Sequence, residues 1–249
     1  MIYPTKQYVS GDYLNKVPDW HEDEAPWKAQ EVFRMLSKNR IQPKTVCDVG
    51  CGAGAILKEL QNKMSDDVSF TGFDISPQAI SICKKLENTK LKFYNNDFLE
   101  LDLEPFDVLL LLDVLEHIPD YLGFLNSISN RARWYIFHIP LDISVHTIIR
   151  QSPIMYMRRQ YGHLHYFLQE TALATLEDTG FHIVDSFYTM DAYSIEDLQK
   201  AEKSTRKLVW KLWLKLRKIF FRLHQDVGAI CFQGFNLMVL AKGQIHEVD

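Results

Sequence analysis

The sequence predicts an α/β fold in which a mostly parallel sheet is covered by helices on both faces. Strand-like apolar segments alternate with helical patterns between residues 44 and 188, which is the order typical of parallel sheets. The segment 108–112 is apolar without interruption, as a central strand buried on both faces requires. A glycine-rich turn follows the first strand-like segment. We expect residues 1–249 to form a single domain.

Periodicity and the residues that begin and end helices locate the elements. An apolar stripe predicts a helix over 24–39, and Pro43 ends it. Ser76 and Pro77 supply an N-cap and a first-turn proline for a later helix. Further helices are expected at 54–64, 119–130 and 169–180, and strands at 44–49, 68–74, 91–95, 106–112, 134–138, 181–188 and about 229–241.

The turn after the first strand is built for a ligand. Gly50, Gly52 and Gly54 alternate there, and glycines let a backbone turn sharply and approach a bound molecule. The next helix points its N–H groups at that molecule. Asp74 ends the next strand, where it can accept hydrogen bonds from a ribose diol. An adenosine-like ligand is therefore expected at the carboxyl ends of the strands.

The glycine spacing distinguishes between ligands. Dinucleotide sites carry G-x-G-x-x-G, whereas this chain has G-x-G-x-G, with Asp48 two residues before the first glycine. An anion there disfavours a phosphate, and hence a nicotinamide dehydrogenase, but suits a ligand with an ammonium and a sulfonium. The stretch 46–54 resembles motif I of the class I S-adenosylmethionine-dependent methyltransferases.

Two later stretches extend the resemblance. Residues 91–98 end a third strand in an acid, and residues 106–119 end a fourth strand in D-V-L-E-H-I-P. In order and spacing these elements resemble small-molecule methyltransferases related to ubiquinone-biosynthesis enzymes, over about residues 44–140.

The resemblance implies S-adenosylmethionine as cofactor and a Rossmann-like class I methyltransferase fold. That fold has a mostly parallel seven-stranded sheet with helices on both faces and an antiparallel last strand at the edge. It also implies cofactor-binding roles by position: Asp48 for the turn and the ligand's ammonium, Gly50, Gly52 and Gly54 for backbone approach, Asp74 and Ile75 for the ribose, Asp97 and Phe98 for the adenine, and Asp113 and Val114 for the methionine. Tyr8 and Trp27 either cap the cofactor or belong to the core.

Methyl transfer to a hydroxyl also needs a base, and histidine is the natural candidate near neutral pH. The candidates are His117 in the D-V-L-E-H-I-P run and His163 and His165 in the segment 161–167, with His138 as a further alternative. The segment 161–167 resembles a G-H-x-x-x-F/Y element that covers the acceptor pocket of many relatives. Its two histidines face the same way if it is extended. No metal is expected.

Composition sets broad limits. The net charge is −4, and 47% of the residues are apolar, as in ordinary globular proteins. Cys47, Cys51, Cys83 and Cys231 show no C-x-x-C spacing, so we expect them to be reduced and the protein to be cytoplasmic. We expect no signal peptide and no membrane-spanning segment.

A second unusual feature is a lid at about 141–167 followed by an inserted basic amphipathic helix at about 195–223. Residues 203–222 contain eight basic and no acidic side chains. One interpretation is a helix packed on the domain with a solvated charged face. The other is peripheral membrane contact through 203–223, with Trp210 and Trp213 at the lipid boundary. The negative net charge disfavours a nucleic-acid contact.

Together these features predict methyl transfer from S-adenosylmethionine to a small-molecule acceptor, on oxygen, with a lipid-like acceptor favoured by the helix. The alternative is a non-catalytic S-adenosylmethionine-binding or scaffold protein that retains the fold.

Overall fold

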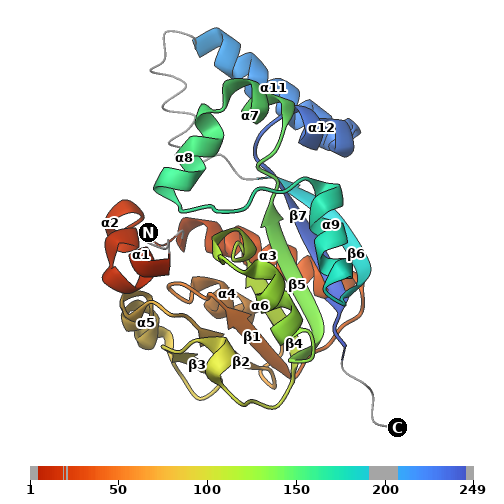
Figure 1. The fold of residues 1–249 in the computed structure, drawn as a ribbon. Helices are drawn as coiled ribbons and strands as arrows, with labels where there is room; N and C mark the ends of the chain where they lie inside the picture. Colours follow the sequence, from red (N-terminus) through yellow and green to blue (C-terminus); the bar gives the residue numbers. More distant parts are fainter. Residues whose placement is uncertain (1–4, 19, 21, 191–206, 245–249) are drawn as a thin grey trace.

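The apolar segment 108–112 lies at the centre of the sheet, as its composition predicts. Val108 and Leu110 point into one buried cluster, whereas Leu109 and Leu111 point into a second cluster on the opposite face. Alternate side chains of a strand point to opposite faces, so the unbroken apolar run supplies both cores. The computed structural model, drawn in Figure 1, describes residues 5–18, 20, 22–190 and 207–244.

The sheet has seven strands in the order β3-β2-β1-β4-β5-β7-β6. The strands are parallel except β7, which is antiparallel to both β5 and β6. This arrangement confirms the predicted fold class. The strands are β1 (Thr45–Val49), β2 (Ser69–Phe73), β3 (Leu91–Tyr94), β4 (Phe106–Leu112), β5 (Ala132–Pro140), β6 (His182–Met190) and β7 (Phe235–Lys242).

The last strand corrects two expectations. It begins at Phe235 rather than near 229, because residues 225–231 form a helix. It also lies between β5 and β6 rather than at the edge. Every residue of β7 except its last is buried, whereas β6 has several exposed or half-buried residues. A strand that is apolar throughout is stabilised by neighbours on both sides, and the more polar β6 suits the edge.

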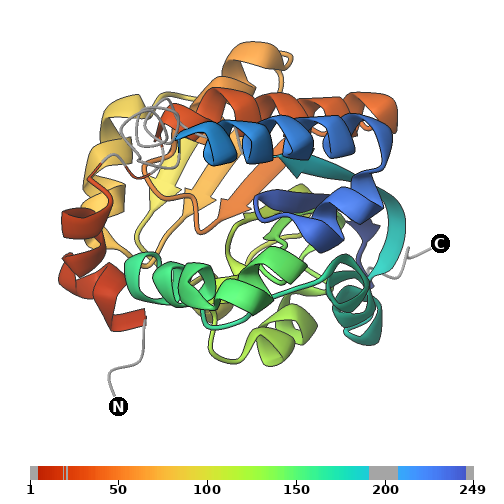
Figure 2. The ribbon, with the colours of Figure 1, turned by 90° about the horizontal axis from the view of Figure 1, so that it is seen from above.

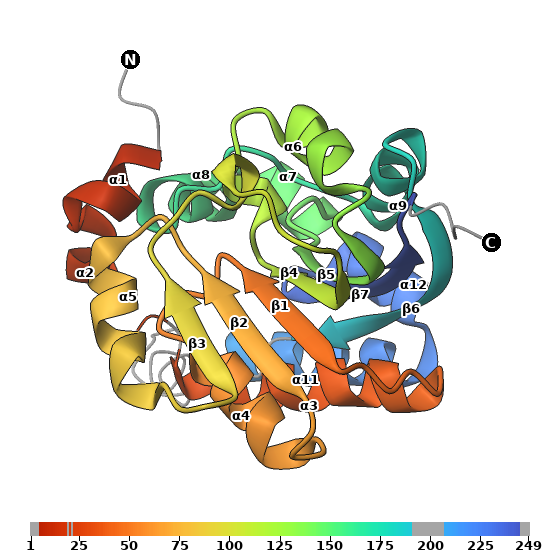
Figure 3. The ribbon, with the colours of Figure 1, turned by 90° about the horizontal axis from the view of Figure 1, so that it is seen from below.

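Helices cover both faces of the sheet. The apolar stripes of α3 and α4 pack into one cluster, and those of α6 and α9 pack into the other; Figure 3 shows the two layers on either side of the strands. The described α-helices are α1 (Thr5–Ser10), α2 (Asp12–Lys16), α3 (Ala25–Lys38), α4 (Ala55–Lys63), α5 (Pro77–Cys83), α6 (Tyr121–Ile128), α7 (Val145–Arg150), α8 (Ser152–Gln160), α9 (Gln169–Asp178), α11 (Lys207–Leu223) and α12 (Gln225–Cys231). Ser76 caps α5 by accepting a hydrogen bond from Ala79 N, and Pro77 begins this helix, as predicted.

Five short helices and the longer α11 gather at the carboxyl end of the sheet, where Figures 1 and 2 show α1, α2, α7, α8, α11 and α12. The sequence patterns did not predict α1 or α2, nor the two helices within the lid. Helix α11 fits the predicted basic helix from residue 207 onward, and the expected start near 195 lies outside the described residues. None of the described helices combines the length and hydropathy needed to cross a bilayer.

Candidate functional site

A cavity of about 1500 Å³ opens at the carboxyl end of the sheet. Its wall is formed by the loops that follow β1, β2, β3 and β4, and by residues of α1, α2 and α8. The carboxyl ends of parallel strands are where open α/β sheets bind ligands. The cavity is therefore the candidate site.

The glycine turn forms one side of the cavity. The φ values are positive at Gly50, Gly52 and Gly54, at 80°, 53° and 78°. Residues with a Cβ atom rarely adopt this backbone region. The backbone N–H groups of Gly50 and Cys51 both donate to the carbonyl of Phe73, at 2.8 and 3.1 Å. These bonds fix the turn against the end of β2, with bare backbone facing the cavity.

Asp74 joins this turn to the next helix. Its Oδ2 accepts a hydrogen bond from Gly52 N at 2.9 Å, and its Oδ1 accepts one from Ser76 N at 2.7 Å. Burial raises the pKa of Asp74, and the two backbone donors partly offset this shift. Ile75 follows it in the cavity wall. Both residues lie where the sequence predicted a ribose site.

Asp97 and Phe98 lie together further along the wall. Asp97 is exposed and accepts a hydrogen bond from Leu99 N at 3.0 Å, which begins the short 3-10 helix η3 (Phe98–Glu100). Phe98 is buried and packs edge-on against Phe73, with ring centroids 5.5 Å apart. An acid beside an aromatic face is the arrangement predicted for an adenine.

Asp48 is buried and does not line the cavity. Its expected support of the turn and of a ligand's ammonium stays a prediction. The side chain lies on β1 beneath the turn because the parallel neighbours of β1 enclose it. Burial and the nearby Asp74 raise the pKa of Asp48 to about 7.

Asp113 belongs to a buried charged network. Its Oδ1 lies 2.6 Å from His138 Nδ1, and its Oδ2 lies 2.6 Å from Lys28 Nζ. Lys28 also pairs with Glu24 at 2.6 Å, and His138 Nε2 lies 2.8 Å from Thr189 Oγ1. Burial opposes the charge, but His138 and Lys28 hold the pKa of Asp113 well below its usual range. His138 is fully engaged in this network and does not line the cavity.

The sequence patterns did not indicate Lys28, which lines the cavity with Asp113 and Val114. The available signal was its position within the buried stripe of α3, between apolar residues. A lysine in such a stripe needs a partner, because an unpaired buried charge is costly. Its neighbour in the wall, Val114, packs against the turn so closely that a Cβ on Gly50 would lie 2.8 Å from Val114 Cγ2.

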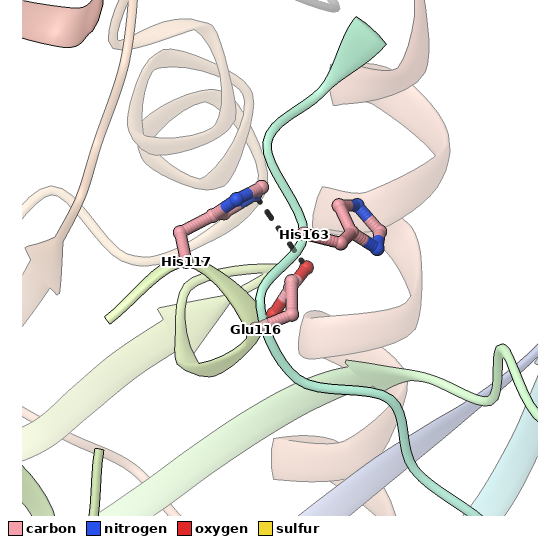
Figure 4. A group of neighbouring side chains, drawn as sticks. All are labelled: Glu116, His117 and His163. Carbon is pink, nitrogen blue, oxygen red and sulfur yellow. Dashed lines mark ion pairs between the residues drawn. The ribbon is translucent and has the colours of Figure 1, made fainter. Parts of the chain in front are cut away.

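Three further side chains meet beyond Val114, as Figure 4 shows. Glu116 and His117 come from the 3-10 helix η4 (Leu115–His117), and His163 comes from the segment after α8. One potential ligand atom from each lies within 4.8 Å of the others. The backbone N–H groups of Leu164 and His165 donate to the Glu116 carbonyl, at 2.7 and 3.2 Å, and bring the two segments together.

This cluster buries a carboxyl group, and His117 Nε2 lies 3.8 Å from Glu116 Oε1. Glu116 is 1% exposed, and within the described residues neither of its carboxylate oxygens accepts a hydrogen bond. Burial raises the pKa of Glu116 to about 8. His163 Nδ1 lies 2.6 Å from Asp142 Oδ2. Although burial opposes the imidazolium, the bond to Asp142 and the charge of Glu116 raise the pKa of His163.

A carboxylate and two imidazoles are also the donor types of transition-metal sites. The Asp142 carboxylate behind His163 matches the outer partner that metal-binding histidines usually have. From the sequence no metal was expected, and neither Glu116 nor Asp142 was a predicted site residue. Only the tertiary fold brings residues 142 and 163 against residue 116. The spacing of these residues in the sequence therefore could not indicate that they form a cluster.

His165 lies apart from this cluster. Its Nε2 lies 2.9 Å from the Ile118 carbonyl, its ring is 4.4 Å from that of Tyr121, and it does not line the cavity. His163 and His165 therefore have different partners, and of the two only His163 lines the cavity.

The N-terminal helices cover the open side of the cavity. Tyr8 Oη donates to the Tyr161 carbonyl at 3.2 Å, and its ring lies 5.7 Å from that of His117. Tyr8 lines the cavity, and its capping of the cofactor stays a prediction. Trp27 is half-buried, packs against His138 with ring centroids 5.8 Å apart, and does not line the cavity.

Comparison with known proteins agrees with this geometry. Residues 20–186 match a family described as a methyltransferase domain. The chain is 33% identical over 110 residues to the mitochondrial ubiquinone biosynthesis O-methyltransferase of Schizosaccharomyces pombe, covering 41% of this chain and 38% of that protein. It is 33% identical over 107 residues to the ubiquinone biosynthesis O-methyltransferase of Aliivibrio fischeri, covering 41% and 44%. The match spans less than half the length of either relative.

Solved structures share the fold. The crystal structure of a Synechocystis magnesium protoporphyrin IX methyltransferase with bound SAH has a TM-score of 0.56 and 17% identity, covering 88% of this chain and 83% of that one. This likeness and the strand order confirm the predicted class I methyltransferase fold. Since the family match extends over well more than half of the sequence, this chain belongs to the methyltransferase domain family.

Proposed function

We propose that this protein transfers the methyl group of S-adenosylmethionine to an oxygen atom of a small-molecule acceptor. The observation that carries the proposal is that the glycine turn and the Glu116–His163–Asp142 group line the same cavity. A cofactor site and a proton-accepting group are thus adjacent. Relatives named as O-methyltransferases support the choice of oxygen.

In this proposal the cofactor lies across the carboxyl ends of β1, β2 and β4. The backbone of the glycine turn approaches it, Asp74 and Ile75 hold the ribose, and Asp97 and Phe98 hold the adenine. Asp113, Val114 and Lys28 border the methionine. The ammonium of Lys28 adds a cation that suits the methionine carboxylate.

The chemistry is an in-line displacement in which the S–CH₃ bond breaks as an O–CH₃ bond forms. His163 accepts the proton of the acceptor hydroxyl, and Asp142 orients its ring and stabilises the charge that it gains. His117, beside His163 with ring centroids 5.0 Å apart, borders the acceptor. Positioning supplies the rest of the rate enhancement.

The same cluster favours a metal-assisted version of this reaction as a second candidate. A divalent cation held by Glu116, His117 and His163 would neutralise the buried carboxylate and bind the acceptor oxygen as its proton leaves. Turnover after exhaustive chelation, with and without added Mg²⁺, Mn²⁺ or Zn²⁺, separates the two versions. Full activity in the chelated protein favours His163 as the base.

The cavity also bears on the acceptor. Its volume of about 1500 Å³ leaves ample room beside a cofactor. The four cysteines are reduced, which favours a cytoplasmic protein. We place the protein peripherally at a membrane through residues 203–223, with a lipid-like acceptor.

Calorimetric titration with S-adenosylmethionine, S-adenosylhomocysteine and NAD tests the cofactor. We expect binding of the first two and none of NAD. Turnover is then measured on phenolic acceptors with and without an apolar tail. Cofactor binding without turnover on any of them would favour the non-catalytic scaffold, and NAD binding would overturn the cofactor assignment.

A further inference from the structure

Three neighbouring helices, α7, α11 and α12, lie at the carboxyl end of the sheet (Figures 1 and 2). They expose large apolar side chains. Ile149 of α7 is 77% exposed, and Leu208 and Leu223 of α11 are 84% and 68% exposed. The full set is Val145, Ile148 and Ile149 from α7, Leu208, Leu212, Leu216, Ile219 and Leu223 from α11, and Val227 and Ile230 from α12. Large apolar groups gathered on one face mark an interaction site.

Helix α11 does not need these leucines for its own packing. Its inner side is formed by other residues, including Leu214, which is buried, and Trp213, whose ring lies 5.1 Å from His146 and 5.8 Å from Phe232. Trp213 was expected at the lipid boundary, and it packs into the protein instead. The five exposed apolar residues recur every three or four positions, so they form a separate outer stripe.

The charge on the same helices is mostly positive. Helices α7 and α11 contain seven Lys and Arg residues and no acidic residue, and α12 contains one acid, Asp226, although the chain as a whole has a net charge of −4. On α11 the exposed Lys211, Lys215, Lys218 and Arg222 form a stripe beside the apolar one. Apolar and basic groups thus face outward side by side.

We propose that α7, α11 and α12 form a docking surface for an anionic lipid bilayer. The apolar stripe would enter the acyl boundary while the adjacent lysines and arginines contact the lipid headgroups. A nucleic acid would engage the basic stripe but would leave ten exposed Val, Ile and Leu side chains without a partner. The bilayer is the partner that matches both stripes.

The docking surface is continuous with the wall of the cavity. In α8, Tyr156 and Met157 line the cavity, and the neighbouring Met155 is exposed. The connection between α12 and β7 contributes residues 233–236 to the same wall. Docking would bring this side of the cavity to the headgroup layer. The inference rests on the proposed function in one respect only, namely that the acceptor is an amphiphile whose polar end enters the cavity.

Co-sedimentation of the full chain with vesicles tests the surface. The vesicles contain phosphatidylcholine alone or phosphatidylcholine with phosphatidylserine. We expect binding to the anionic vesicles only, and its loss in high salt. The variants Lys211→Glu/Lys215→Glu and Ile148→Ser/Ile149→Ser should each bind at least roughly tenfold more weakly.

Matched controls show whether vesicle binding depends on this surface or only on the net charge and overall hydropathy of the chain. Lys90→Glu/Lys92→Glu makes the same charge change at the β3 edge, and Val184→Ser removes an exposed apolar residue from β6. Both should bind vesicles as the unmodified chain does. Circular dichroism and affinity for S-adenosylmethionine check that every variant folds.

Absence of vesicle binding at low salt would overturn the inference. So would a loss of vesicle binding in the control variants equal to that in the surface variants. Light scattering that shows a dimer broken by Ile148→Ser/Ile149→Ser would assign the surface to a second copy, and salt-sensitive RNA binding lost in the lysine variant would assign it to a nucleic acid. Turnover on a water-soluble phenol, measured without vesicles, does not depend on membrane docking. If it persists while vesicle binding fails, the proposed methyl transfer stands, whereas the docking surface and the peripheral membrane location do not.

Discussion

At the residue scale, Asp74 shows how a single carboxylate can serve both the fold and a ligand. Each of its oxygens already accepts one backbone hydrogen bond, from Gly52 N and from Ser76 N. A carboxylate oxygen has two lone pairs, so each can still accept a bond from a ribose hydroxyl. The backbone donors hold the carboxylate in position before the cofactor arrives.

Replacing Asp74 with Ala should weaken S-adenosylmethionine binding by about 1–3 kcal/mol, the scale of a lost hydrogen bond to a charged group. Calorimetry measures it, with the exposed Asp67→Ala as the matched control. An unchanged dissociation constant in a folded Asp74→Ala protein would remove Asp74 from the ribose site.

Replacing His163 with Ala should lower turnover by about 10²-fold or more, because the group that accepts the proton is removed. Cofactor affinity should stay the same. His165→Ala is the control, since His165 bonds the Ile118 carbonyl outside the cavity. Equal rates for the two variants would contradict the role given to His163, and His117 would then be the next candidate.

The sequence could predict those site residues that follow strands at regular spacing. The glycine turn, Asp74, Ile75, Asp97 and Phe98 all lie at the cavity, because in a parallel sheet the strand ends meet at one edge. Lys28 and Asp142 were missed, since each acts through a partner distant in sequence.

At the element scale, the junction of β1 and α4 depends on close approach to β3. Gly54 has a φ of 78°, and a Cβ there would lie 2.5 Å from Phe93 Cζ. Gly52 shares the positive φ, but its nearest neighbour would be Trp20 Cε3 at 3.6 Å. Both glycines therefore need a positive φ, but only Gly54 also lacks room for a Cβ atom.

Gly54→Ala should destabilise the protein by about 2–4 kcal/mol, since backbone strain adds to overpacking. Gly52→Ala should cost about 1–2 kcal/mol, from strain alone. Urea denaturation of both variants measures the difference. Equal losses would mean that Phe93 and Cys83 move aside at little cost.

Periodicity predicted the long elements of the fold and failed for the short ones. The central strands and α3 have clear patterns, whereas α1, α2 and α7 have six residues or fewer, too few to establish a helical period. The position of β7 also escaped prediction, because a fully apolar strand does not reveal which strands it will pair with.

At the scale of the whole molecule, buried Asp48 links stability to pH. Burial and Asp74 raise its pKa to about 7 in the fold, whereas an unfolded aspartate titrates near 3.9. Between these values the folded chain binds more protons than the unfolded chain. Stability therefore falls as pH rises through this window, and the loss is complete above about pH 7.

Asp48→Asn should remove this dependence. We expect the unmodified protein, without cofactor, to lose about 2–4 kcal/mol relative to the variant between pH 4 and pH 7.5. Urea denaturation across this range measures the free energy of unfolding for both proteins. Parallel pH profiles would show that Asp48 ionises in the fold as it does in the unfolded chain.

The strand order has a consequence for how the chain acquires its structure. Strand β7 begins at Phe235 but separates β5 from β6, which ends at Met190. During synthesis β6 leaves the ribosome well before the strand that must attach it to the sheet. Until then its inner face and one side of β5 lack their partners, and exposed strands of this kind are prone to aggregate. The intervening basic helix is made during this interval, so its like charges would keep nascent chains apart while the sheet awaits closure.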